Sequence, residues 1–205
     1  MRVSSSMTRS STHRSDDQGY PSVLFYDTFH YTILAEDRPD FLPKRMTKTN
    51  LMGYDYLFFP IHLGNHWAFA YASTRNRKLY YLDSVYGYDK GMEVLGRLQK
   101  YIYQEELRLK GECPLFPVTP FRLTVYSNCP QQANGVDCGV FLLANADYIS
   151  RRSPPLFSQH DIPNIRCCIV WELVTRRMIK NICNTLKFNP PITHPLREKD
   201  RDLHQ

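Results

Sequence analysis

The amino-acid sequence predicts one α+β domain in which a central sheet of a few strands packs against helices. Two observations lead to this fold class. Short apolar and aromatic runs, typical of buried strands, lie between residues 56 and 83. Longer segments with apolar residues at helical spacing follow them. With 205 residues, of which 42% are hydrophobic, the chain can bury one real core.

The strand segments come first along the chain. Tyr56–Ile61 is continuous, aromatic and short, which predicts a buried strand, and Pro60 predicts its far end or a sheet edge. The pair Asn76–Arg77 indicates a turn that joins the next two strands into a hairpin. These two strands are Trp67–Ala72 and Leu79–Asp83, a further strand is expected at Phe121–Tyr126, and Ser22–Tyr26 fits a strand or a short helix.

Three helices are expected after the hairpin. Asp89–Lys110 has apolar residues on one face, and Gly111 ends it. A second, apolar helix begins at or near Cys138. Asp161 can cap the third helix, which should run to about Cys183.

The two ends of the chain differ from its middle. Residues 1–19 are rich in Ser, Thr and Arg and poor in apolar groups, so we expect them to be disordered. The folded domain is expected to span residues 20–186. Residues 187–205 are expected to form a polar C-terminal tail.

Charge and cysteine content narrow the class of protein. The formal net charge is +6, but basic and acidic residues are mixed without a block of like charges, so nucleic-acid binding is not expected as the main role. The sequence contains no apolar window of about 18 residues, so no membrane-spanning helix is predicted. The six cysteines contain no CxxC pair and no secretory signal opens the chain, so we expect free thiols in a reducing compartment.

The clearest candidate for chemistry is a cysteine at the start of a helix. A polar, turn-rich loop ends in Cys138, where the helix N-terminus favours the thiolate and offers N–H groups to a developing oxyanion. Gln132, six residues upstream, is a second possible oxyanion donor. Gly135 lets the backbone approach a substrate closely. The alternative is a buried structural cysteine.

A thiolate nucleophile needs a base. His66 stands at the start of one predicted strand and Asp83 at the end of the next. If these strands are antiparallel neighbours, the carboxylate can hydrogen-bond one ring nitrogen and hold the tautomer, as in a Cys-His-Asp triad. His62 and His66 also have HxxxH spacing, but that spacing serves a metal on a helix, and here the residues lie between strand-like runs. No metal site is therefore expected.

Three motifs follow one another along the chain: Gly64-Asn-His-Trp-Ala68, Tyr81-Leu-Asp-Ser84 and Cys129-Pro-Gln-Gln-Ala-Asn-Gly-Val-Asp-Cys-Gly139. In this order they resemble the Ulp/SENP family of SUMO-specific cysteine proteases. Shorter similar segments extend the resemblance over roughly residues 15–180. It implies a papain-like, Ulp-type α+β fold for residues 20–186, with a central mixed sheet flanked by helices, and a thiol protease that needs no cofactor or metal.

The resemblance also implies roles for individual residues. Trp67 would cover the narrow channel that holds the modifier's Gly-Gly tail. Only residues without side chains fit such a channel, which would make the enzyme selective for this tail. Arg45 would lie on the modifier-binding surface, and Gly135 would lie against the substrate. By the same resemblance, Cys138 is the nucleophile, His66 the general base, Asp83 its orienting acid and Gln132 the oxyanion donor.

The sequence departs from the family pattern in two places. A Trp-Leu-Asn/Asp-Asp segment and the helix that usually open the domain have no counterpart here, so we expect one wall of the channel to be missing. The usual Lys-Arg-Trp-Thr-Lys run has Met46 in place of Trp. These departures leave a non-catalytic modifier-binding module as an alternative to an enzyme.

The resemblance implies the removal of SUMO from conjugated proteins, and maturation of the SUMO precursor as a related reaction. The partners would be SUMO and SUMO-conjugated proteins. The expected location is the nucleus, with the cytoplasm as a second site. A protease of the same fold for ubiquitin or a Nedd-type modifier is the alternative.

Overall fold

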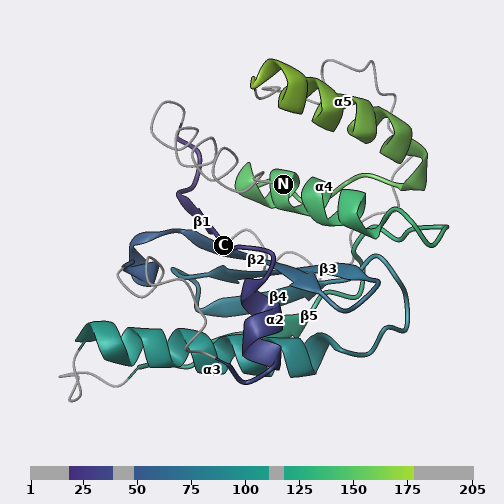
Figure 1. Ribbon diagram of the computed structural model, residues 1–205. Coiled ribbons are helices and arrows are strands. Elements are labelled where there is room, and N and C mark those ends of the chain that lie inside the picture. The colour runs from purple at the N-terminus through teal and green to yellow at the C-terminus, as the bar shows by residue number, and fades with distance from the viewer. Residues whose placement is uncertain (1–18, 39–48, 111–117, 178–205) are drawn as a thin grey trace. The chain divides into compact units, whose positions relative to one another are not determined.

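The computed structural model describes residues 19–38, 49–110 and 118–177 (Figure 1). The chain forms two compact units, one that ends at His160 and one that begins at Asp161. The first unit contains a five-stranded sheet with helices on both of its faces. In its described part, the second unit contains one helix.

The sheet is mixed, and its strands lie side by side in chain order. The three inner strands pair antiparallel, whereas each outer strand pairs parallel with its neighbour. This confirms the predicted mixed sheet and hairpin, and it decides that the segment near residue 24 is a strand. The strands are β1 (Val23–Phe25), β2 (Tyr56–His62), β3 (Trp67–Ser73), β4 (Lys78–Leu82) and β5 (Arg122–Val125).

The prediction that Pro60 marks the far end of its strand is wrong, whereas the predicted edge is present locally, because β2 has no β1 partner beyond Phe58. Pro60 lies inside β2, the second of the five strands, opposite Phe69 of β3. Leu63 donates its N–H to the carbonyl of His66, so by alternation the nitrogen of residue 60 faces the β1 side. β1 pairs with β2 only as far as Phe58. The missing N–H of proline therefore costs no hydrogen bond of the sheet.

Helices cover both faces of the sheet (Figure 1). On one face, α2 (His30–Ala35) packs against β2, and α3 (Gly91–Lys110) packs against β4 and β5. On the other face, α4 (Cys138–Ser150) packs against β3 and β2. The fold thus places the helix that begins at Cys138 on the opposite side of the sheet from the long helix.

The long helix starts close to the sheet. An added Cβ on Gly91 would lie 2.7 Å from a side-chain atom of Val125 and 2.9 Å from one of Tyr81. Only glycine therefore lets α3 begin at this distance from β4 and β5. The predicted stop at Gly111 lies outside the described residues.

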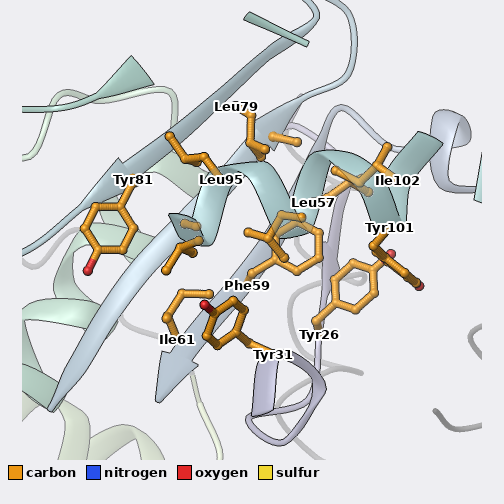
Figure 2. Close-up of a cluster of buried hydrophobic side chains, with 14 of the residues drawn as sticks. Tyr26, Tyr31, Leu57, Phe59, Ile61, Leu79, Tyr81, Leu95, Tyr101 and Ile102 are labelled. Atoms are coloured by element: carbon orange, nitrogen blue, oxygen red, sulfur yellow. The ribbon is translucent and has the colours of Figure 1, made fainter. Parts of the chain in front are cut away.

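The face covered by α2 and α3 carries the main core (Figure 2). Successive side chains of a strand point to opposite faces, so alternate residues of the inner strands gather on this side. Leu57 and Phe59 of β2 and Leu79 of β4 form one buried cluster with Leu95 and Ile102 of α3. Full burial of one such side chain stabilises the fold by about 1.5–3 kcal/mol. This core holds the inner strands together, and with them the residues at the strand ends.

The other face of the sheet is rich in aromatic side chains. The rings of Phe58 and Phe69 meet edge to face at 5.1 Å between centroids. The rings of Tyr71 and Tyr80 stack at 4.7 Å. These pairs cross from β2 to β3 and from β3 to β4, so aromatic packing adds to the backbone pairing of the three inner strands.

The second unit contains α5 (Ile162–Thr175). Asp161 occupies the N-cap position as expected, but its side chain makes no capping hydrogen bond. The helix ends at Thr175 because Arg176 adopts a left-handed φ of 54°. The prediction that this helix runs to about Cys183 is therefore wrong.

One histidine is buried in the core without a hydrogen bond. His30, at the start of α2, is 2% exposed, and neither ring nitrogen has a partner among the described residues. Its ring lies 4.4 Å from that of Tyr26 and 4.6 Å from that of Tyr101. Burial lowers the pKa of His30 to about 3. The imidazole is therefore neutral at pH 7.

We expect His30 to make the fold sensitive to acid. The pKa of His30 falls from 6.5 to about 3 on folding, so between these pH values the unfolded state binds more protons. The contribution of His30 to stability is complete above pH 6.5 and is lost as the pH falls toward 3, by about 1.4 kcal/mol per pH unit. Urea unfolding from pH 7 to pH 4 should show this loss in the wild type but not in His30→Phe.

The exposed His160 provides the matched control for this experiment. His160→Phe removes one histidine but leaves His30 in the core. Parallel pH profiles for the wild type and His30→Phe would contradict the prediction.

Candidate active site

Cys138 is the first residue of α4, as the sequence predicts, and is 7% exposed. The carbonyl of Asp137 accepts the N–H groups of Val140 at 2.8 Å and Phe141 at 3.0 Å. The N–H groups of Cys138 and Gly139 precede these bonds, so helix geometry leaves them without intrahelical acceptors. The thiol thus lies at the positive end of α4, beside N–H donors that can hold an oxyanion.

His66 and Asp83 lie at the same end of the sheet. β3 begins directly after His66 and β4 ends directly before Asp83, and the hairpin pairs Phe69 with Leu82. The expected hydrogen bond is present, because Nε2 of His66 lies 2.7 Å from Oδ1 of Asp83, with both side chains less than a tenth exposed. Nδ1 of His66 is therefore the ring nitrogen that remains to take a proton.

The carboxylate of Asp83 is itself held in place. Its Oδ2 accepts the hydroxyl of Tyr81 at 2.7 Å, and its Oδ1 also accepts the N–H of Val85 at 2.9 Å. Burial and the negative charge of Asp83 raise the pKa of Tyr81, so the phenol remains a donor. Sequence reasoning missed Tyr81. The available signal was its position two residues before Asp83, which places both side chains on one face of the strand.

The residues that follow the candidate base and nucleophile approach each other. An ideal Cβ on Gly139 would lie 3.8 Å from Cδ1 of Trp67, so the indole lies against the start of α4. The ring of His62 also lies beside this indole, with 4.4 Å between the ring centroids. Packing of α4 on β3 thus brings the sequence neighbourhoods of His66 and Cys138 together.

The loop before α4 is held by polar side chains. Nδ2 of Asn134 donates to Oδ2 of Asp137 at 2.6 Å, and Oδ1 of Asn134 accepts the N–H of Val136 at 3.0 Å. Gln159 donates to the same Asp137 oxygen at 2.8 Å and accepts the N–H of Ala133 at 2.8 Å. Asp137 is 5% exposed, so its carboxylate is a buried anchor for the loop. No role was predicted from the sequence for Asn134, Asp137 or Gln159.

A second cysteine lies beside the candidate triad. Cys129 is buried and donates its thiol proton to the carbonyl of Asp83 at 2.9 Å, and Nε2 of Gln131 donates to the same oxygen at 2.8 Å. Burial raises the pKa of Cys129 to about 11, so this thiol stays neutral at pH 7. Cys129 therefore has a structural role, in which its thiol bonds the backbone of Asp83. Among the described cysteines, Cys129, Cys138 and Cys167 are free thiols.

The remaining predicted residues lie in different surroundings. Gln132 joins its loop to the hairpin, because its backbone N–H donates to the carbonyl of Ser84 at 2.8 Å. A Cβ added to Gly135 would meet nothing within 4 Å, so the loop surface is open at this point. Arg45 lies outside the described residues. The substrate contacts expected of Gly135 and Arg45 stay predictions.

Across the described residues, no three His, Cys, Asp or Glu side chains gather in a way that could hold a metal ion. No described helix is long and apolar enough to cross a membrane.

Comparison with known proteins decides the family. The model of the Ulp1 protease family, C-terminal catalytic domain, matches residues 1–173. The chain belongs to this family. The resemblance that the three sequence motifs carry is thereby confirmed.

Curated relatives share about a third of the aligned residues. A sentrin-specific protease of Caenorhabditis elegans is 30% identical over 166 residues, and sentrin-specific protease 2 of Homo sapiens is 34% identical over 168 residues. Each alignment covers 81% of this chain. The chain spans only 23% and 28% of the length of these two relatives, so the similarity concerns one part of longer proteins.

Solved structures share the fold. The C-terminal Ulp1 protease domain in complex with Smt3, the yeast ortholog of SUMO, matches with a TM-score of 0.66 and 28% identity, over 83% of this chain and 74% of that one. The Ulp1-like SUMO protease catalytic domain of Chaetomium thermophilum matches with a TM-score of 0.61 and 20% identity, over 83% of this chain and 67% of that one. The predicted Ulp-type α+β fold is confirmed.

We expect Asp83→Asn to slow the alkylation of Cys138 by iodoacetamide at pH 7 by about tenfold. Asparagine keeps an oxygen for His66 but removes the charge that stabilises the imidazolium formed when His66 takes the thiol proton. Mass spectrometry of the separated peptides measures the rate at each cysteine. The exposed Cys167 serves as the internal control. An unchanged rate at Cys138 would argue against the proton transfer.

Proposed function

We propose that this chain is a cysteine protease that removes SUMO from conjugated proteins by cleaving after the modifier's C-terminal Gly-Gly. The observation that carries the proposal is the hydrogen-bonded His66–Asp83 pair at the end of the β3–β4 hairpin, together with the packing on β3 of the helix that begins at Cys138. The 28% identity with a Ulp1 domain in complex with Smt3 supports SUMO as the modifier.

The reaction begins with proton transfer from Cys138 to Nδ1 of His66. Asp83 holds Nε2 of the ring and stabilises the imidazolium that forms. The thiolate attacks the carbonyl carbon of the terminal glycine and gives a tetrahedral oxyanion. The N–H groups at the start of α4 and the amide of Gln132 stabilise this negative charge.

The second half of the reaction releases both products. The tetrahedral intermediate collapses as the C–N bond breaks, and the imidazolium of His66 gives its proton to the departing lysine amine. A SUMO thioester of Cys138 remains. Neutral His66 then removes a proton from water, whose oxygen attacks the thioester carbonyl. Collapse of this second intermediate releases the SUMO carboxylate and restores the thiol. Cleavage of a peptide bond in the SUMO precursor follows the same steps.

Selectivity for a Gly-Gly tail follows from the position of Trp67. Its indole lies against Gly139 beside the nucleophile, so a substrate segment that reaches Cys138 passes this ring. A tail without side chains fits such a passage, whereas a bulky residue would collide with it. SUMO and SUMO-conjugated proteins are the proposed partners because the likeness to the Ulp1 domain in complex with Smt3 favours SUMO among modifiers with such a tail.

The test uses modifiers that carry a C-terminal vinyl sulfone, which a thiolate attacks to form a stable thioether. Purified chain should form an adduct with the SUMO probe, and Cys138→Ala should form none. Cys129→Ala, which removes the neighbouring buried thiol, should still form the adduct. Ubiquitin and Nedd-type probes are run in parallel. Adducts with ubiquitin alone would overturn the substrate, and binding of SUMO without an adduct would favour a modifier-binding module.

We also propose that the protein acts in the nucleus, with the cytoplasm as a second site. The proposal follows from the family resemblance and from the arginine-containing tail of the chain. A fluorescent fusion of the full chain should be concentrated in the nuclei of transfected cells. Exclusion of the fusion from the nucleus would contradict the proposal.

A further inference from the structure

Two segments that are distant in sequence are joined by hydrogen bonds next to the candidate triad. The carbonyl of Asp83 accepts from the side chains of Cys129 and Gln131. The next carbonyl, that of Ser84, accepts the backbone N–H of Gln132 at 2.8 Å. The hairpin end that carries the acid thus also holds the loop that leads to the nucleophile.

The side chains of Ser84 and Gln132 add a bond to this junction. Oγ of Ser84 lies 2.7 Å from Oε1 of Gln132, and Ser84 is 3% exposed. At the other end of the amide, Nε2 of Gln132 donates to the carbonyl of Asn134. The amide is therefore held at both ends.

These two contacts determine which way the amide points. A carbonyl can only accept, so the end of the Gln132 amide that faces Asn134 must be the NH₂ group. Oε1 then faces Ser84, whose hydroxyl must donate. In the flipped orientation, Oε1 would face the carbonyl oxygen of Asn134, and two acceptors would repel each other.

The NH₂ end of the amide is bonded to the segment that leads to the nucleophile. Nε2 donates to the carbonyl of Asn134, whose side chain donates to Asp137, the residue before Cys138. Nε2 carries two hydrogens, and Asn134 is its only partner among the described residues. The second hydrogen is available to an oxyanion.

We infer that Ser84 is a positioning residue that orients the amide of Gln132 for oxyanion stabilisation. The inference rests on the proposed function, in which Gln132 donates to the oxyanion. Without the Ser84 hydroxyl, only the Asn134 carbonyl holds the amide, and because the terminal amide torsion has a broad energy minimum, the donor is held less firmly. A flipped amide would present an oxygen to the negative charge and raise the barrier.

The test is a double-mutant cycle with a SUMO–aminomethylcoumarin substrate. Gln132→Ala should lower kcat by about a hundredfold, as expected for the loss of one oxyanion donor. Ser84→Ala should lower kcat by about tenfold with little change in KM, as expected for the loss of one hydrogen bond. Ser84→Ala should add no further loss in the Gln132→Ala background, because it acts through that residue.

A matched control separates orientation from general damage. Ser73 is also buried, at the opposite end of β3 from His66, so Ser73→Ala should keep kcat within about twofold of the wild type. Full activity in either Ser84→Ala or Gln132→Ala would overturn the inference. So would an equal Ser84→Ala loss with and without Gln132.

A second measurement does not depend on turnover. The side-chain ¹H–¹⁵N amide pair of Gln132 is identified by its disappearance in Gln132→Ala. In Ser84→Ala this pair should shift while the pair of Gln159 stays in place, and an unmoved pair would overturn the inference. If the wild type fails to cleave SUMO, the proposed function fails, but these amide signals still decide whether Ser84 holds Gln132.

Discussion

The hydrogen bond between His66 and Asp83 is the interaction on which the rest of the candidate site depends. Asp83 supplies more than a partner for the imidazole. Its second carboxylate oxygen accepts the Tyr81 hydroxyl, and its backbone carbonyl accepts side-chain donors from Cys129 and Gln131. A one-residue slip of β4 would turn these groups to the other face of the sheet. The register of one hairpin therefore aligns the base, its acid and the nucleophile loop.

The core that holds this register lies on one face of the sheet. Tyr81 belongs to the buried cluster under α3, while its hydroxyl reaches the carboxylate at the strand end. Gly91 allows α3 to begin against that ring. Apolar packing and site geometry are thus coupled through one tyrosine, because a shift of α3 would move the group that holds Asp83.

The nucleophile comes from the other face. α4 packs on β3, and the indole of Trp67 lies against Gly139, next to Cys138. The sheet lies between the apolar core under α3 and the helix that begins at the reacting thiol (Figure 1).

By itself, the sequence determined the mixed α+β fold, the hairpin, and the residue types of a Cys-His-Asp set at His66, Asp83 and Cys138. These follow from local spacing and turn chemistry, and from motifs short enough to recognise. Only the tertiary structure decided that Ser84 and Tyr81 hold the polar groups of the site, and that proline fits inside β2. The physical reason is that such bonds join segments far apart in the chain, and no local pattern states which donors and acceptors the fold will bring together.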